Sequence, residues 1–234
     1  MDVSINKNLL DDNQKFQEEL WVYRKVGCAN QDHINFYLNQ KETNEKFEHL
    51  TKQIESLKGD LSKYKSTIID DGQYKILNDW VDNKKSWNFV LLYRASENEF
   101  SVSSFHEKCD NKGPTITVIK TTSGDVFGGY NSQAWKSEGG AYGDKKCFIF
   151  TLVNKHGIKP TKYLYDANDR QGRYVYADKS FGPVFGWRDI VIHQDKEKSY
   201  QEFPFSFIDT TEQSKTTLSS RLLSLQDYEV FGVL

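Results

Sequence analysis

Cysteine and proline are both scarce in this sequence of 234 residues, which contains three cysteines and four prolines. The three cysteines (Cys28, Cys109 and Cys147) are too few, and odd in number, for a disulfide framework. The sequence also has no Asn-x-Ser/Thr site for N-linked glycosylation. These absences argue against a disulfide-stabilised secreted protein and indicate a reducing compartment, the cytoplasm or the nucleus.

Long hydrophobic runs and an excess of charge of either sign are also missing. No stretch approaches the roughly 18 apolar residues that a transmembrane helix requires, and the N-terminal residues lack a basic region followed by an apolar one. We therefore expect no membrane span and no secretory signal. Lys and Arg number 31 against 33 Asp and Glu, which gives a net charge of −2. This balance disfavours nucleic acid as a partner, although a nucleic-acid-binding regulator stays open as an alternative.

Short catalytic signatures are missing as well. The sequence contains no phosphate-binding GxxxxGKS/T loop, no GxGxxG turn, no GxSxG elbow and no HExxH zinc helix. We therefore expect a protein that is not an enzyme and that carries no cofactor and no metal.

One pair of residues offers a chemical function as an alternative. His106 and Cys109 have the spacing of half a zinc site, which Cys28 and His33 from a distant segment would have to complete. A redox-active Cys109, assisted by His106, would instead need a neighbouring cation or a helix end to lower its thiol pKa. The favoured interpretation is that Cys109 faces the core of a short helix as a small hydrophobic side chain. The redox alternative stays open at this point.

The N-terminal part, residues 1–65, has the composition of a helical segment, rich in Asn, Gln, Glu and Lys, without proline and with one glycine before Gly59. Its apolar residues alternate in steps of three and four, the seam of a heptad repeat: Phe47, Leu50, Ile54, Leu57, Leu61 and Tyr64. Such a helix needs a partner to bury its apolar stripe. The partner is either a second copy of the chain, which makes a homodimer, or the upstream residues folded back as a helical hairpin.

The remaining residues, 66–234, alternate between short β-like runs and turns, and aromatic residues make up 14% of the whole chain. One helix is predicted around residues 76–81, capped by Asp70 or Asp71, and another over 101–111. We expect Trp135 and Trp187 to cover the core. Many strands with few helices predict an antiparallel sandwich; the expected strands are 87–93, 115–120, 125–130, 147–153, 162–165, 172–176, 189–193 and 228–233.

Several of these segments, in this order, resemble the signature of the TLDc domain family. They are residues 87–96, 105–115, 116–120 and 126–130, followed by Trp135, 147–152 and 228–232. The resemblance covers residues 66–234, and the positions that match the family motif are Phe105, His106, Cys109, Asp110, Gly113, Thr115, Phe127, Gly128, Gly129, Tyr130, Trp135, Glu229, Phe231 and Gly232. The chain departs from many animal members over residues 181–189, where they have a glycine-rich segment.

The resemblance implies an α+β fold, a two-sheet antiparallel β-sandwich with flanking short helices, here preceded by an α-helical coiled-coil segment. Family members are associated with protection against oxidative damage, and several bind and regulate the vacuolar proton-pumping ATPase. No catalytic residues are carried by the motif. We therefore expect a cytoplasmic, non-enzymatic protein-interaction module that binds protein partners such as vacuolar ATPase subunits.

Overall fold

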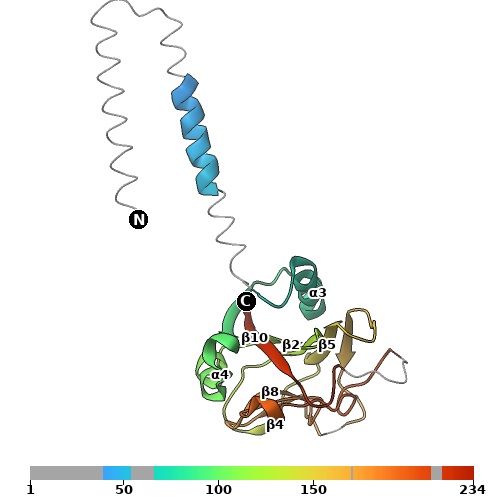
Figure 1. Cartoon of the computed structure of the whole chain (residues 1–234). Coiled ribbons are helices and arrows are strands. Elements are labelled where there is room, and N and C mark those ends of the chain that lie inside the picture. The colour runs from blue at the N-terminus through green and yellow to red at the C-terminus, as the bar shows by residue number, and fades with distance from the viewer. Residues whose placement is uncertain (1–38, 54–65, 170, 212–217) are drawn as a thin grey trace, which may run out of the picture. The chain divides into compact units, whose positions relative to one another are not determined.

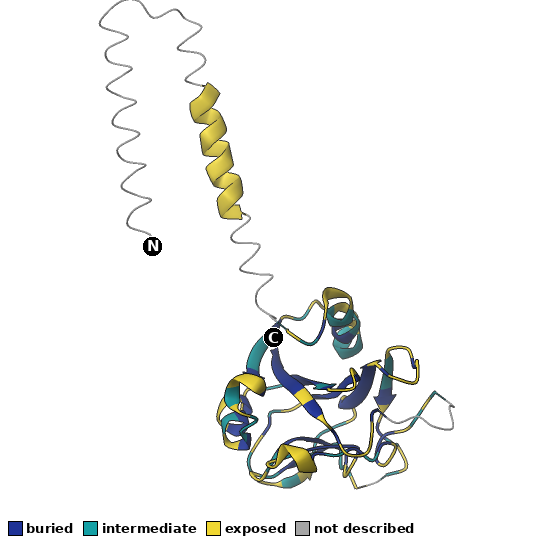
Figure 2. Ribbon diagram, viewed as in Figure 1, coloured by how far each residue is buried: buried dark blue, intermediate teal, exposed yellow. Residues whose placement is uncertain are grey.

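The computed structural model describes residues 39–53, 66–169, 171–211 and 218–234. The chain divides into two units, residues 1–60 and 61–234. In the first unit, residues 39–53 form an α-helix whose residues are all exposed, Phe47 and Leu50 among them (Figure 2). The other four seam positions, Ile54, Leu57, Leu61 and Tyr64, lie outside the described residues.

Six antiparallel strands form the larger sheet of the second unit, in the order β1-β10-β2-β3-β5-β6 (Figure 1). Strand β10 (Leu225–Val233), the last strand described, is second in this order and lies between the edge strand β1 and β2. From Asp227 to Val233 every residue of β10 is buried, because both faces of the sheet are covered. The other strands are β1 (Phe89–Arg94), β2 (Thr115–Thr121), β3 (Val126–Asn131), β5 (Phe148–Val153) and β6 (Thr161–Leu164).

Four antiparallel strands form the smaller sheet, in the order β4-β7-β8-β9. They are β4 (Gly140–Tyr142), β7 (Val175–Ala177), β8 (Phe181–Phe185) and β9 (Ile190–His193). One hydrophobic cluster lies between the two sheets and includes Ile119 from β2 and Phe185 from β8. This arrangement confirms the α+β, two-sheet antiparallel fold.

Two helices flank the sheets. Helix α3 (Asp71–Asp82) begins at Asp70, whose side chain accepts from the Gln73 backbone N–H in a capping box, so the first turn is satisfied as expected. Helix α3 covers the outer face of the larger sheet, where Leu77 joins a second cluster with Ile116 and Val118. Helix α4 (Val102–Cys109) is capped by Ser101, and 3-10 turns η2 (Ser96–Asn98) and η3 (Lys196–Lys198) complete the unit. In the described part of the chain, no helix is long and apolar enough to cross a membrane.

Two strands and one tryptophan differ from the sequence-based expectation. Strands β4 and β8 were not among the strands expected from the sequence, and β8 contains Gly182 and Pro183, which are typical of turns. The register of β8 with β9 is irregular between Phe181 and Val184, so the proline sits where the pairing is interrupted. The expected burial of Trp187 is wrong, since this side chain is 42% exposed in the turn between β8 and β9, whereas Trp135 is buried.

Candidate functional site

Helix α4 presents its apolar face to the core between the sheets. Val102, Phe105 and Cys109 are all buried, and Phe105 makes edge contacts with the rings of Tyr93 and Trp135. Burial raises the pKa of the Cys109 thiol, and the Asp110 carboxylate raises it further, whereas the neighbouring lysines act in the opposite direction. Cys109 therefore remains a protonated thiol without exposed surface at neutral pH, as expected of a packing residue.

His106 connects α4 to the first residue of β8 and to the turn before it. Its Nδ1 lies 2.9 Å from Asp110 Oδ1, and its Nε2 lies 3.2 Å from the Asp178 carbonyl and 3.0 Å from the Phe181 carbonyl. Carbonyl oxygens only accept, so Nε2 carries a proton and donates to them. The second Asp110 oxygen accepts from Ser137 Oγ at 2.6 Å. Both ring nitrogens thus have partners other than Cys109, which is not the geometry of a thiol activated by a general base.

The glycine pair in β3 is a point of close packing. A Cβ atom on Gly129 would lie 2.5 Å from the Phe185 ring of the facing sheet. A Cβ atom on Gly128 would lie 1.9 Å from the Thr117 carbonyl oxygen of β2. The facing sheet at Gly129 and the neighbouring strand β2 at Gly128 therefore lie too close for a side chain at either position. The other motif residues in this region lie in or beside the strands: Gly113, Thr115, Phe127, Tyr130, Trp135, Phe231 and Gly232.

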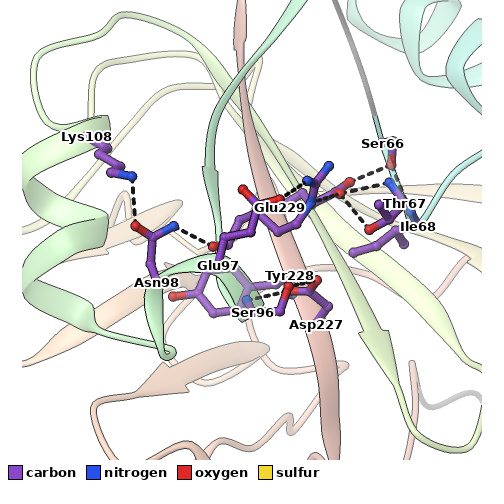
Figure 3. Close-up of polar contacts among 11 residues, drawn as sticks. Ser66, Thr67, Ile68, Ser96, Glu97, Asn98, Lys108, Asp227, Tyr228 and Glu229 are labelled. Atoms are coloured by element: carbon purple, nitrogen blue, oxygen red, sulfur yellow. Dashed lines mark hydrogen bonds and ion pairs between the residues drawn. The ribbon is translucent and has the colours of Figure 1, made fainter.

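Glu229 in β10 gathers a group of polar partners that we call the Glu229 cluster: Arg94, Glu97, Ser66, Thr67 and Glu229 (Figure 3). Its Oε1 accepts from Arg94 Nε at 2.7 Å and from the Thr67 backbone N–H at 2.9 Å. Its Oε2 accepts from Ser66 Oγ at 2.5 Å. The Glu229 side chain has no exposed surface, and Arg94 also contacts the exposed Glu97 at 2.5 Å.

A second carboxylate on β10 holds the adjoining loop. Asp227 Oδ1 accepts from the Ser96 backbone N–H at 2.9 Å, and Oδ2 accepts from Ser96 Oγ at 2.6 Å (Figure 3). Lys108 Nζ of α4 donates to Asn98 Oδ1 at 2.7 Å, so the same loop is tied to α4. Both oxygens of Glu229 are occupied by protein donors, and this arrangement is that of an anchor for the segment entering the domain.

The described residues include no group of three or more His, Cys, Asp or Glu side chains placed to hold a metal ion. Cys28 and His33, which a zinc site with His106 and Cys109 would require, lie outside the described residues.

Comparison with known families decides what kind of domain this is. The family model of the TLDc domain matches residues 62–234, most of the chain. The chain belongs to the TLDc domain family. Its TLDc domain is the unit that contains both sheets, α4 and the Glu229 cluster.

Curated relatives share parts of the TLDc domain. The MTOR-associated protein MEAK7 of Danio rerio is 41% identical over 89 residues, 38% of this chain and 18% of the relative. MEAK7 of Xenopus laevis is 31% identical over 104 residues, 44% of this chain and 21% of the relative. The GTPase-activating protein skywalker of Drosophila melanogaster is 35% identical over 135 residues, 49% of this chain and 22% of the relative. The chain thus spans about a fifth of the length of these relatives.

The TLDc domain contains site residues that sequence reasoning did not find. Arg94, Ser66 and Thr67 are more than a hundred positions from Glu229 in sequence and meet it only in the folded sheet. A glutamate surrounded by hydrophobic residues in 228–233 was the one available signal, because a buried carboxylate requires a charged or hydrogen-bonding partner. The sequence did not indicate which residue that partner would be.

Proposed function

We propose that this TLDc domain acts as a non-enzymatic regulatory module that binds a protein partner. The observation that carries the proposal is the burial of Cys109, the thiol of the family motif, together with the raised pKa of that thiol. The other motif side chains either fill the core or hold backbone segments in place. A scaffold of this kind supports recognition at its surface.

The proposed partners are subunits of the vacuolar proton-pumping ATPase, with a role in the oxidative-stress response. This finer assignment is supported by the family resemblance, which links TLDc proteins to both. The MEAK7 relatives are named MTOR-associated proteins, which adds to the case for a protein partner. We place the protein in the cytoplasm or the nucleus, in keeping with its sparse cysteines.

We further propose that residues 1–65 form a coiled-coil segment that dimerises the chain, with the TLDc domain over residues 66–234. Two seam residues on helix 39–53 support this proposal, since Phe47 is 71% exposed and Leu50 is 55% exposed in the single chain. A helix of this kind gains most of its stability from a partner that covers its apolar side chains.

Binding of the purified chain to the purified peripheral sector of a vacuolar ATPase, followed by biolayer interferometry, tests the proposal. Cys109→Ala is the matched variant, and we expect it to bind as tightly as the wild-type chain. Absence of binding by both proteins contradicts the assignment of the partner.

The redox alternative is tested on the same two proteins by alkylation and by peroxide. We expect iodoacetamide to label native Cys109 far more slowly than the unfolded chain, because burial raises the pKa of this thiol and shields it. Rapid labelling, or oxidation of Cys109 to sulfenic acid before the other two cysteines, contradicts the non-enzymatic assignment.

A further inference from the structure

The turn between β8 and β9 places an exposed tryptophan beside a small hollow in the smaller sheet. The hollow has a volume of about 220 Å³ and is lined by four aromatic side chains, two valines and one arginine: Tyr176, Phe181, Val184, Trp187, Arg188, Val191 and Tyr200. We call it the Trp187 pocket. Trp187 is 42% exposed, and Phe205, whose ring Arg188 covers at 5.9 Å, is 50% exposed.

Backbone contacts hold the rim of the Trp187 pocket in place. Gly186 has φ +66°, and a Cβ atom there would lie 2.0 Å from Asp189 Oδ2, so only glycine fits this turn. The fully buried Asp189 carboxylate accepts from the backbone N–H groups of residues 205, 206 and 207 at 2.8–3.2 Å. The Trp187 backbone N–H donates to Ser206 Oγ at 2.9 Å. The turn and the 205–207 loop are thus fixed before any ligand arrives, which lowers the entropy lost on binding.

Contacts between neighbouring side chains also hold the aromatic rings around the pocket in fixed orientations. Tyr176 meets the Trp187 ring edge-on at 5.7 Å, and Arg173 lies over the same ring at 5.4 Å. Trp, Tyr and Arg are the residues that dominate the energetics of protein interfaces. A surface that concentrates all three around one hollow, with two large aromatic side chains partly in water, has the composition of an interface centre.

The charge at the rim selects the partner. Glu202 is shared by two guanidinium groups, those of Arg188 at 3.4 Å and Arg221, whose Nε lies 3.1 Å away. At the surface of this rim two guanidinium groups therefore face one carboxylate, while the neighbouring Asp189 carboxylate is fully buried and accepts from the backbone N–H groups of residues 205–207. The Arg188 and Arg221 side chains are 50% and 70% exposed, against 20% for Glu202, so the cations are what a partner meets. An acidic ligand is the complement of this rim.

The size of the pocket indicates a side chain of a peptide. A volume of about 220 Å³ is below the roughly 300–1,000 Å³ of cofactor and small-molecule sites. We propose that the Trp187 pocket binds an acidic segment of a protein partner, which inserts one bulky apolar side chain and places a flanking carboxylate near Arg188. This inference rests on the proposed function, because it describes the partner that the module recognises.

The test titrates the isotopically labelled full chain with an acetylated peptide that has one central leucine flanked by glutamates. The readout is the set of backbone and indole N–H signals in two-dimensional NMR spectra, with the Trp187 indole identified by its loss in Trp187→Ala. We expect shifts confined to the pocket residues. Trp187→Ala should weaken the affinity about tenfold or more, as for a central interface residue. Arg188→Gln should weaken it about threefold, as for a partly exposed charge.

Leu164→Ala is the matched control, because Leu164 is 53% exposed in β6, lies outside the pocket and should leave the affinity unchanged. Two control peptides, with glutamines for the glutamates and with alanine for the leucine, should each bind more weakly. Unfolding midpoints of the variants establish that they are folded.

The inference is overturned by the absence of shifts up to about 1 mM peptide, the weak end of the affinity scale, or by equal losses in the Leu164 variant. Binding of the wild-type chain to phosphatidylserine vesicles with no response to the peptide would also overturn it, in favour of a membrane ligand. Failure of the proposed function is separate: a chain that binds the peptide but not the vacuolar ATPase sector retains the pocket and loses the assigned partner.

Discussion

Arg94 and Glu229 stand opposite each other on β1 and β10, with 2.7 Å between the arginine Nε and the glutamate Oε1. The same carboxylate accepts from Ser66 and Thr67, the first described residues of the TLDc domain (Figure 3). One buried charge therefore joins the segment before α3 to the last strand described, β10. A fully buried carboxylate is tolerated here because the arginine neutralises it and the protein donors satisfy both of its oxygens.

Removing the charge of Glu229 should destabilise the domain strongly. Glu229→Gln leaves the Arg94 guanidinium, 11% exposed, without its buried partner, and losses of this type are about 3–5 kcal/mol. Glu97→Gln is the matched control, because Glu97 pairs with the same arginine but is 61% exposed and should cost less than about 1 kcal/mol. Urea unfolding of both variants measures the two free energies, and similar losses would contradict the role of Glu229 as an anchor.

The two glycines of β3 should respond differently to alanine. Gly129→Ala meets the Phe185 ring at 2.5 Å, and overpacking of this type costs about 1–3 kcal/mol. Because the obstacle is a side chain, Phe185→Leu in the same chain should recover part of that loss. Gly128→Ala meets the Thr117 carbonyl at 1.9 Å and the Phe150 ring at 3.0 Å. Since the nearer obstacle is backbone, Phe150→Leu should recover little.

Double-mutant cycles on unfolding free energies measure both couplings. We expect a favourable coupling between the substitutions at 129 and 185, and a coupling near zero between those at 128 and 150. Equal recovery in the two cycles would show that the backbone of β2 moves away from β3 as readily as a ring does.

Local signals in the sequence predicted much of this fold. The sequence offered Asp70 or Asp71 as the cap of α3, and the structure has Asp70 in that role. The apolar run at 147–153 became β5, because both of its faces are covered. The exposure of Trp187 could not be predicted in this way. A tryptophan is typical of a hydrophobic core, whereas the turn after β8 places this side chain at the surface. The partners of Glu229 were also beyond local reasoning, because strand order brings β1 and β10 together.

Alkaline pH should destabilise the domain through its buried tyrosines. Burial is the main cause that raises the pKa of Tyr93, Tyr130, Tyr163 and Tyr165 to about 12, whereas an unfolded tyrosine titrates near about 10. Between these values the unfolded chain releases protons that the folded chain keeps, so the free energy of unfolding falls as pH rises from about 10 to 12. Below pH 10 both the folded and the unfolded chain hold these protons, so the contribution of the tyrosines to the free energy of unfolding is constant.

Urea unfolding over this range measures the slope, and Tyr93→Phe is the variant that tests its origin. It removes one titrating group, at the loss of the hydrogen bond from the Tyr93 hydroxyl to the Ser101 carbonyl at 3.1 Å. We expect the variant to be less stable at neutral pH but to lose stability less steeply in alkali. Parallel curves for the two proteins would exclude Tyr93 as a contributor.

The seam of the N-terminal segment should determine the oligomeric state of the chain. Phe47 and Leu50 are largely exposed on helix 39–53, and a heptad seam buries such side chains against a second helix. Light scattering should therefore give about twice the 27.2 kDa mass of one chain for the wild type. Replacing both seam residues with glutamine should produce a monomer, because the variant has no apolar seam to bury against a second helix.

The control is the double variant Glu45→Gln with Lys52→Gln, which should remain dimeric. It changes exposed residues on the opposite side of the helix without altering net charge. A monomeric wild type would contradict the homodimer and favour the alternative in which the upstream residues fold back on the seam.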